Sequence, residues 1–161
     1  MIILSNTSPL NNLAAIDQLH LLKELYSSII IPSEVYQELM AVETPIHVSN
    51  QIKKAQWIKV EQVISLTTIK LLEQQLDRGE AEAIALALQL KADLLVIDEK
   101  KGRTVTNGFN IPFTGILGIL IQAKQKGLIS EVKPLLDNLK TKAGFWIKPN
   151  LYQNILQRVR E

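Results

Sequence analysis

Four side chains of this 161-residue sequence could supply oxygen ligands to a common site: Asn6, Glu38, Glu80 and Asp98. Three are carboxylic acids and one is an amide, and the two histidines lie in unrelated segments without metal-ligand spacing. Carboxylates gathered in one place raise one another's pKa values unless a divalent cation neutralises them. Ligand sets made only of oxygen suit Mg²⁺ or Mn²⁺ better than zinc. Such a cation polarises a phosphate and activates water, so the chemistry indicated is phosphodiester hydrolysis.

The elements that must position these side chains are predicted by three apolar runs, at residues 2–4, 28–31 and 94–97. Their nearly continuous apolar character is typical of strands buried on both faces, and amphipathic helical patterns lie between them. The alternation predicts an α/β fold with a parallel sheet covered by helices. Ligands of such sheets bind beyond the carboxyl ends of the strands, where the strand order reverses. Asp98 directly follows the third run, and Asn6 follows the first run after Ser5.

The remaining segments give less distinct patterns. We expect a loop over residues 43–49, a strand near 57–60 and a short edge strand over 111–113, with Thr114 as N-cap of the next helix and Gly127 just past its end. Predicted helices cover residues 66–75, 80–90, 115–126, 131–141 and 149–160. The chain is expected to form a single domain over 1–161, with residues 130–161 as C-terminal helices packed on it.

Each candidate also has an explanation that needs no catalysis. The caps predicted are Asn6 or Ser8 for the first helix, a capping box of Asp77 with Glu80, and Asp98 for the helix after the third strand. Glu38 fits this explanation least. It falls in the last turn of a short helix, facing the negative end of the helix dipole, where a cation or a donor must compensate.

Composition narrows the functional classes further. The chain has no cysteine, which excludes thiol catalysis, disulfides and cysteine-based zinc sites. Aromatic residues make up 5%, which argues against a nucleic-acid binder that works mainly by base stacking. No stretch approaches the roughly 20 apolar residues of a membrane span, and the first residues lack the basic region of a signal peptide. We therefore expect a cytoplasmic protein without a membrane partner.

Three cations follow Asp98 closely, at Lys100, Lys101 and Arg103. They stand where they could hold phosphates beside a metal, which favours nucleic acid as the substrate. Lysines on helices are more often simply solvated, and the formal net charge of +2 does not by itself require a polyanionic partner.

Four segments together resemble the PIN-domain superfamily, and more narrowly a prokaryotic branch related to the toxin ribonucleases of toxin–antitoxin pairs. They are "SNTSPL" from Ser5, "IIIPSEVYQEL" from Ile29, "LDRGEAEAIALALQLKADLLVIDEKKGR" from Leu76 and "FTGILGILIQAKQKGLI" from Phe113. The resemblance spans nearly the whole chain. It implies a three-layer α/β/α fold around a parallel sheet of four to five strands, and Mg²⁺- or Mn²⁺-dependent cleavage of RNA.

The resemblance also assigns roles to individual residues. Glu38, Glu80 and Asp98 correspond to the second, third and fourth acids of the metal site, with Glu82 a weaker substitute for the third. Thr7 matches a hydroxyl that accompanies the first acid, and we place it with Lys100, Lys101 and Arg103 among the residues expected to face RNA. The first acid itself corresponds to Asn6. An amide can still ligate Mg²⁺ weakly, but the site loses a full negative charge.

The leading hypothesis is therefore a metal-dependent ribonuclease, the toxin of a toxin–antitoxin pair, in which Asn6, Glu38, Glu80 and Asp98 form the catalytic metal site. The alternative that Asn6 keeps open is a catalytically weak or inactive PIN module that binds nucleic acid or a protein partner. A third is an interaction protein whose acids are all helix caps. The resemblance further implies a small antitoxin partner and a homodimer. An apolar stripe at Leu151, Ile155 and Val159 would dock on the chain's own core or on a second subunit.

Overall fold

The computed structural model describes all residues, 1–161. Its elements in chain order are β1 (Ile3–Ser5), α1 (Thr7–Ala15), α2 (His20–Tyr26), β2 (Ile29–Pro32), α3 (Ser33–Leu39), α4 (Ile46–Lys54), β3 (Ile58–Glu61), α5 (Leu66–Leu72), α6 (Arg78–Leu90), β4 (Leu94–Val96), α7 (Lys100–Gly108), β5 (Phe113–Thr114), α8 (Ile116–Gln125), α9 (Lys133–Lys142) and α10 (Pro149–Arg158). The longest helix has 13 residues, and no helix combines the length and apolar character needed to cross a membrane.

The five strands form one parallel sheet in the order β3-β2-β1-β4-β5. The chain builds outward from β1 to β2 and β3, then returns to place β4 on the other side of β1. The strand order therefore reverses between β1 and β4, which pair with Ser5 opposite Val96. Parallel α/β sheets bind ligands at the carboxyl ends of such neighbouring strands.

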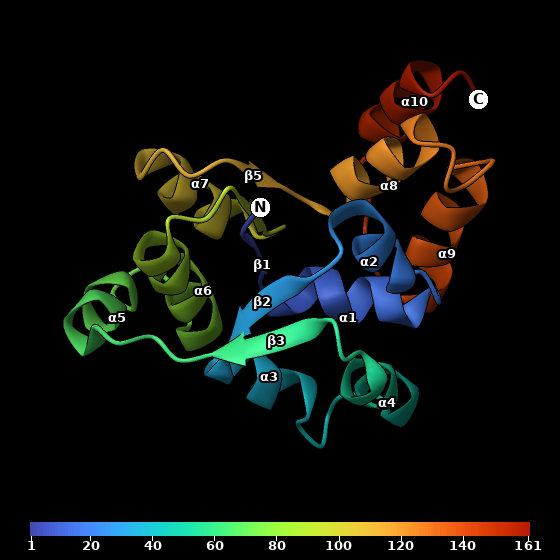
Figure 1. The fold of residues 1–161 in the computed structure, drawn as a ribbon. Helices are drawn as coiled ribbons and strands as arrows, with labels where there is room; N and C mark the ends of the chain where they lie inside the picture. Colours follow the sequence, from blue (N-terminus) through green and yellow to red (C-terminus); the bar gives the residue numbers. More distant parts are fainter.

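Side chains that alternate along the strands feed two apolar cores, one on each face of the sheet. Ile3 and Val96 join the larger core with residues of α1–α4 and α8–α10, whereas Leu4 and Leu95 join the smaller core with residues of α5 and α6. Figure 1 shows α5, α6 and α7 on one side of the sheet and α1, α2, α8 and α9 on the other. The fold is thus the expected three-layer α/β/α arrangement, with a sheet of five parallel strands.

All five predicted strands are present, and several boundaries are corrected. The edge strand expected over 111–113 is β5 at Phe113–Thr114, so Ile111 and Pro112 precede it. The segment expected as a loop contains the start of α4, whose N-cap is Pro45 and which buries Val48 and Ile52. Helix α5 ends at Leu72, earlier than predicted. Thr114 is the last residue of β5, and Gly115 takes the N-cap position of α8. Gly127 adopts a φ of +75° just past α8, as expected for a residue that ends a helix.

The C-terminal helices pack on the rest of the chain. Ile155, Leu156 and Val159 belong to the larger core, so most of the predicted apolar stripe docks on the chain itself. The Glu161 carboxylate accepts the backbone N–H groups of Val132 and Lys133, at 2.7 and 2.9 Å, where α9 begins. Leu151 remains 43% exposed.

Candidate active site

Asn6 extends the pairing of β1 by one residue and then starts the first helix. Its backbone N–H donates to the Val96 carbonyl at 2.9 Å, and it is the N-cap residue of α1. Its side chain makes no capping hydrogen bond, so the prediction that this amide caps the helix is wrong. Asn6 is 3% exposed, and its Oδ1 is buried without a hydrogen-bond partner. A buried acceptor without a donor is costly and indicates a missing ligand, ion or water.

Asp98 follows β4 and is held by a different helix from the one predicted. Glu99 is the N-cap of α7, whereas Asp98 Oδ1 accepts the Ile116 N–H at the start of α8, at 3.0 Å. A Cβ atom at Gly115 would overlap Asp98 Oδ1, so the close approach depends on glycine there. The other oxygen, Oδ2, is buried without a partner.

The surroundings of Asp98 make its ionisation more costly than that of an exposed aspartate. Burial raises its pKa to about 6, and the negative charge of Glu99 adds to the rise, while the Ile116 N–H and the Arg103 charge oppose it. Asn6 and Asp98 thus place two orphaned oxygen atoms beyond neighbouring strand ends at the reversal point of the sheet.

Glu38 lies in the last turn of α3, as predicted, and its compensating partner is a hydroxyl. Thr7, the first residue of α1, donates its Oγ1–H to Glu38 Oε2. The carboxylate packs against the backbone of Gly79 in the first turn of α6, where a Cβ atom would overlap it. Burial raises the pKa of Glu38, and the Thr7 hydrogen bond opposes that rise. The nearby charges of Asp77, Glu34 and Glu82 raise the pKa further.

Glu80 forms the predicted capping box with Asp77. The Glu80 N–H donates to Asp77 Oδ1 at 2.8 Å, and the Asp77 N–H donates to Glu80 Oε1 at 3.2 Å. Burial raises the pKa of Glu80 to about 7, and the Asp77 side chain and the Glu99 charge add to the rise, while the Asp77 N–H opposes it. The free oxygen, Oε2, faces the backbone of α7 at Gly102, where a Cβ atom would lie 3.1 Å from it.

Glu82, the weaker substitute, is committed to other contacts. Its Oε2 accepts from Arg78 Nε at 2.7 Å, and its Oε1 accepts the Glu34 N–H at 3.3 Å. Glu80 and Glu82 are two positions apart on α6, or about 200° around the helix axis, and therefore face different surroundings.

The structure does not gather the predicted acids into one tight cluster. No group of three or more His, Cys, Asp or Glu side chains is arranged to hold a metal ion. Instead, two other acids lie close enough to raise the pKa values of the predicted ones. Asp77 acts on both Glu38 and Glu80, and Glu99 acts on both Glu80 and Asp98. The sequence signal for Glu99 is its position directly after Asp98, which places a second carboxylate at the end of the same strand.

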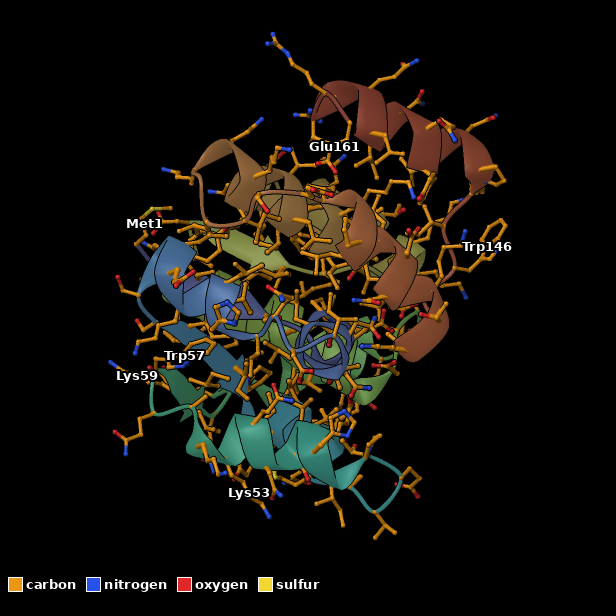
Figure 2. All side chains as sticks on the ribbon, turned by 90° about the vertical axis from the view of Figure 1, so that its right-hand side faces the viewer. Met1, Lys53, Trp57, Lys59, Trp146 and Glu161 are labelled. Atoms are coloured by element: carbon orange, nitrogen blue, oxygen red, sulfur yellow. The ribbon has the colours of Figure 1, made fainter.

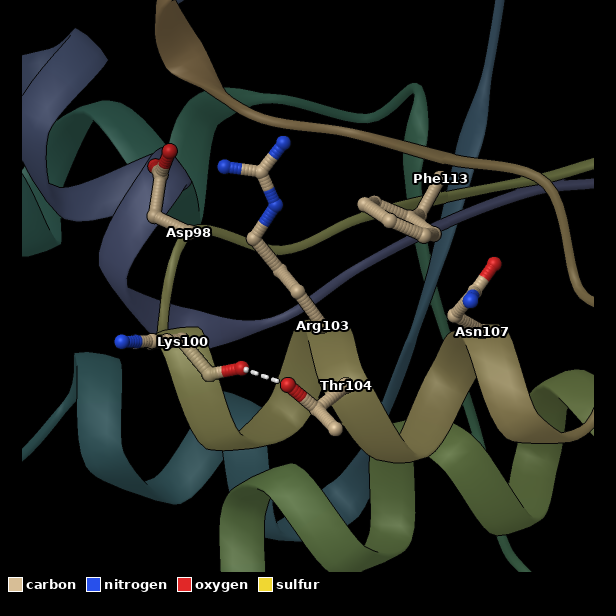
Figure 3. Close-up of a pocket in the computed structure, with 6 residues that line it drawn as sticks. All are labelled: Asp98, Lys100, Arg103, Thr104, Asn107 and Phe113. Carbon is tan, nitrogen blue, oxygen red and sulfur yellow. Dashed lines mark hydrogen bonds between the residues drawn. The ribbon is translucent and has the colours of Figure 1, made fainter.

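The predicted cations fall into two cavities. One, of about 480 Å³, is lined by Asp98, Lys100, Arg103, Thr104, Asn107 and Phe113, and Figure 3 shows their side chains. Lys101 lines a second cavity, of about 560 Å³, which shares Lys100 and Thr104 with the first. All four ion pairs of the chain involve other residues, so these three cations have no carboxylate partner. Sequence reasoning missed Asn107 and Phe113.

The donor set partly fits a divalent cation. The orphaned Asn6 Oδ1 and Asp98 Oδ2 are hard oxygen ligands of the kind that Mg²⁺ and Mn²⁺ take, and each has no hydrogen bond that competes with a cation. Glu38 and Glu80 each have an oxygen engaged in a hydrogen bond, to the Thr7 hydroxyl and the Asp77 N–H. Thr7 is expected to face RNA, but its hydroxyl group donates a hydrogen bond to Glu38.

Comparison with known proteins agrees with this geometry. A family model described as a PIN domain matches residues 2–161. No curated protein and no solved structure matches the chain significantly. The matched residues include all five strands and every acid described above. PIN domains have a nuclease-type fold and in general depend on divalent metals. The chain, with its parallel sheet and its acids beyond the strand ends, therefore belongs to the PIN-domain family.

Proposed function

We propose that this PIN domain is a Mg²⁺- or Mn²⁺-dependent ribonuclease that hydrolyses phosphodiester bonds. The observation that carries the proposal is Asp98. Its buried carboxyl group has one oxygen without a partner, and it lines a cavity together with Lys100 and Arg103. An unsatisfied anionic ligand beside two unpaired cations suits a site that takes a cation and a phosphate together.

Each residue of the site has a role that follows from its surroundings. Asn6 Oδ1 and Asp98 Oδ2 would hold the metal, and Glu38 and Glu80 would supply the remaining carboxylates. The chemistry that the metal supplies when bound is charge neutralisation at the phosphate and activation of water. Lys100 and Arg103 would hold the substrate phosphate.

The first test separates metal binding from catalysis. Thermal unfolding of the chain with Mn²⁺ should shift upward relative to EDTA, and Asp98→Ala or Glu38→Ala should abolish most of the shift. Cleavage of single-stranded RNA should require Mg²⁺ or Mn²⁺ and should be lost in the same variants. If the metal-induced shift in both variants is as large as in the natural chain, these residues do not bind the metal.

A second candidate function is supported by Asn6 alone. With an amide in place of the first acid, the site has one negative charge fewer, and the domain would bind RNA or a protein without cleaving it. Cleavage by the natural chain compared with an Asn6→Asp variant distinguishes the two. Activity in both supports the ribonuclease, whereas activity in the variant alone supports the binding module.

We further propose that the protein is the toxin of a toxin–antitoxin pair, that it is a homodimer and that it binds a small antitoxin protein. Trp146 is 70% exposed and projects outward at the edge of the molecule, where it offers an apolar contact (Figure 2). Leu151 of α10 is also exposed, at 43%. Expression of the natural chain in a bacterial host should arrest growth, and expression of Asp98→Asn should not. Light scattering should give twice the mass of one chain, and a monomer mass that is independent of concentration would contradict the dimer.

A further inference from the structure

The cavity beside Asp98 offers more than a phosphate site. Besides the charged residues, it is lined by Thr104, Asn107 and Phe113, and its volume is about 480 Å³. Small-molecule sites typically measure about 300–1,000 Å³. The cavity is therefore large enough for a nucleotide, with its base and sugar, beside the site proposed for the phosphate.

Phe113 and Arg103 lie against each other in this cavity. Phe113 lies in β5, paired opposite Leu95 of β4, so the register of the sheet fixes its ring beside the strand that leads to Asp98. The Arg103 guanidinium lies over the ring, 5.1 Å from its centroid. Figure 3 shows the guanidinium between Asp98 and the ring. Unpaired bases stack on aromatic rings and on guanidinium planes, so this pair is suited to hold a base.

Asn107 adds a hydrogen-bonding group beside that pair. It stands four residues after Arg103 on α7, on the same face of the helix, and its exposed side-chain amide makes no hydrogen bond within the chain. Side-chain amides both donate and accept, which matches the mixed donor and acceptor edge of a nucleobase. Figure 3 places this amide close to the ring of Phe113.

We propose that the cavity takes one unpaired nucleobase of single-stranded RNA, next to the phosphate at Asp98. Phe113 and Arg103 stack on the base and Asn107 reads its edge. The inference rests on the ribonuclease function proposed above and names its substrate as RNA with an unpaired base at that position. A base within a duplex has its faces stacked and its edge paired, so it cannot fill the cavity. One stacking position is also compatible with the low aromatic content of the chain.

The test measures binding in EDTA, so that cleavage plays no part. Fluorescence anisotropy gives the affinity for a short single-stranded RNA, for the same strand annealed to its complement, and for strands that carry one abasic nucleotide at successive positions. The natural chain should favour the single strand, and one abasic position should weaken binding by about five- to a hundredfold. In Phe113→Leu that abasic penalty should disappear. Asn107→Ala should lose preference for the base at that same position.

Matched controls separate this role from a structural one. Phe109→Leu alters an exposed aromatic residue outside the cavity, and Asn154→Ala alters an exposed asparagine of α10; both should keep the abasic penalty. Circular dichroism should show all variants folded. Equal abasic penalties in Phe113→Leu and in the natural chain, or no binding to single-stranded RNA, would overturn the proposal. Base discrimination without cleavage would refute the proposed ribonuclease activity and support the base site. Cleavage without base discrimination would support the ribonuclease activity and refute the base site.

Discussion

Replacing Asp98 by asparagine is expected to stabilise the metal-free protein at neutral pH and to weaken the proposed metal site. In the metal-free chain the Asp98 pKa is about 6, against an ordinary value of 3.8. The difference corresponds to about 2–3 kcal/mol, because each pH unit is worth about 1.4 kcal/mol. An asparagine at this position keeps an oxygen that can accept the Ile116 N–H and carries no charge to desolvate.

The sign follows from which state holds the proton. Below about pH 4 both the folded and the unfolded chain carry a neutral Asp98, so its ionisation contributes nothing. As pH rises from about 4 to 6, the unfolded chain ionises while the folded chain retains the proton, and the natural protein loses stability. Above about pH 7 the loss is complete. The stability of Asp98→Asn relative to the natural chain should therefore grow across this interval.

Urea denaturation in EDTA at about pH 4 and about pH 8 measures the effect as a difference of differences. Any fixed packing cost of the new amide, which leaves a buried donor, is present at both pH values and cancels. Asp137→Asn is a control whose relative stability should change little between these two pH values, because hydrogen bonds from Tyr152 and Lys133 lower the pKa of Asp137 and its carboxylate is largely ionised in both the folded and the unfolded chain over this interval. A relative stability of Asp98→Asn that does not change between the two pH values would refute the assignment of a costly buried charge to Asp98.

Three further predictions follow from the same contacts. Glu80→Gln should keep the capping box, since glutamine also serves at that position. Urea denaturation should show that this variant gains stability relative to the natural chain as pH rises from about 4.5 to 7, and a stability difference that does not change with pH would contradict the raised pKa of Glu80. Thr7→Val should lower the free energy of unfolding by about 1–3 kcal/mol at neutral pH, because the Glu38 carboxylate loses its hydroxyl donor. Thr67→Val on the exposed face of α5 should change stability little, and equal effects of the two substitutions would count against the Thr7–Glu38 hydrogen bond. Gly115→Ala should push Asp98 away from the Ile116 N–H, lower the melting temperature and weaken Mn²⁺ binding by calorimetry; unaltered binding would show that Asp98 tolerates the added methyl group.

The sheet could be predicted because the local signals agree. Residues of β1, β2 and β4 are apolar toward both faces, and that pattern survives any detail of side-chain packing. The start of α4 is harder to predict, because Pro45 is typical of a loop and is equally compatible with the start of a helix. Val48 and Ile52 are the buried residues of that helix, so the apolar face that could reveal it is short.

The contacts of the site could not be predicted in the same way. Thr7 and Glu38 are 31 residues apart, and Asp98 and Ile116 are 18 apart, so these hydrogen bonds depend on the packing of whole helices on the sheet. The capping box of Asp77 and Glu80 was predictable because its partners are three residues apart. Phe113 was expected only as part of an edge strand. Its place beside Arg103 follows from the pairing of β5 with β4, which sequence spacing does not reveal.

The amide at Asn6 makes physical sense beside Asp98. The two residues follow neighbouring parallel strands, and burial, with a smaller contribution from the Glu99 charge, already raises the pKa of Asp98 to about 6 with an amide at position 6. An aspartate at Asn6 would add another buried charge, and each carboxylate would raise the pKa of the other until a cation neutralised both. Asparagine keeps an oxygen for the cation and removes that repulsion, so the chain folds with less dependence on metal. The same change weakens the attraction for the metal, and comparison of natural and Asn6→Asp chains in RNA cleavage therefore tests whether this exchange preserves catalysis.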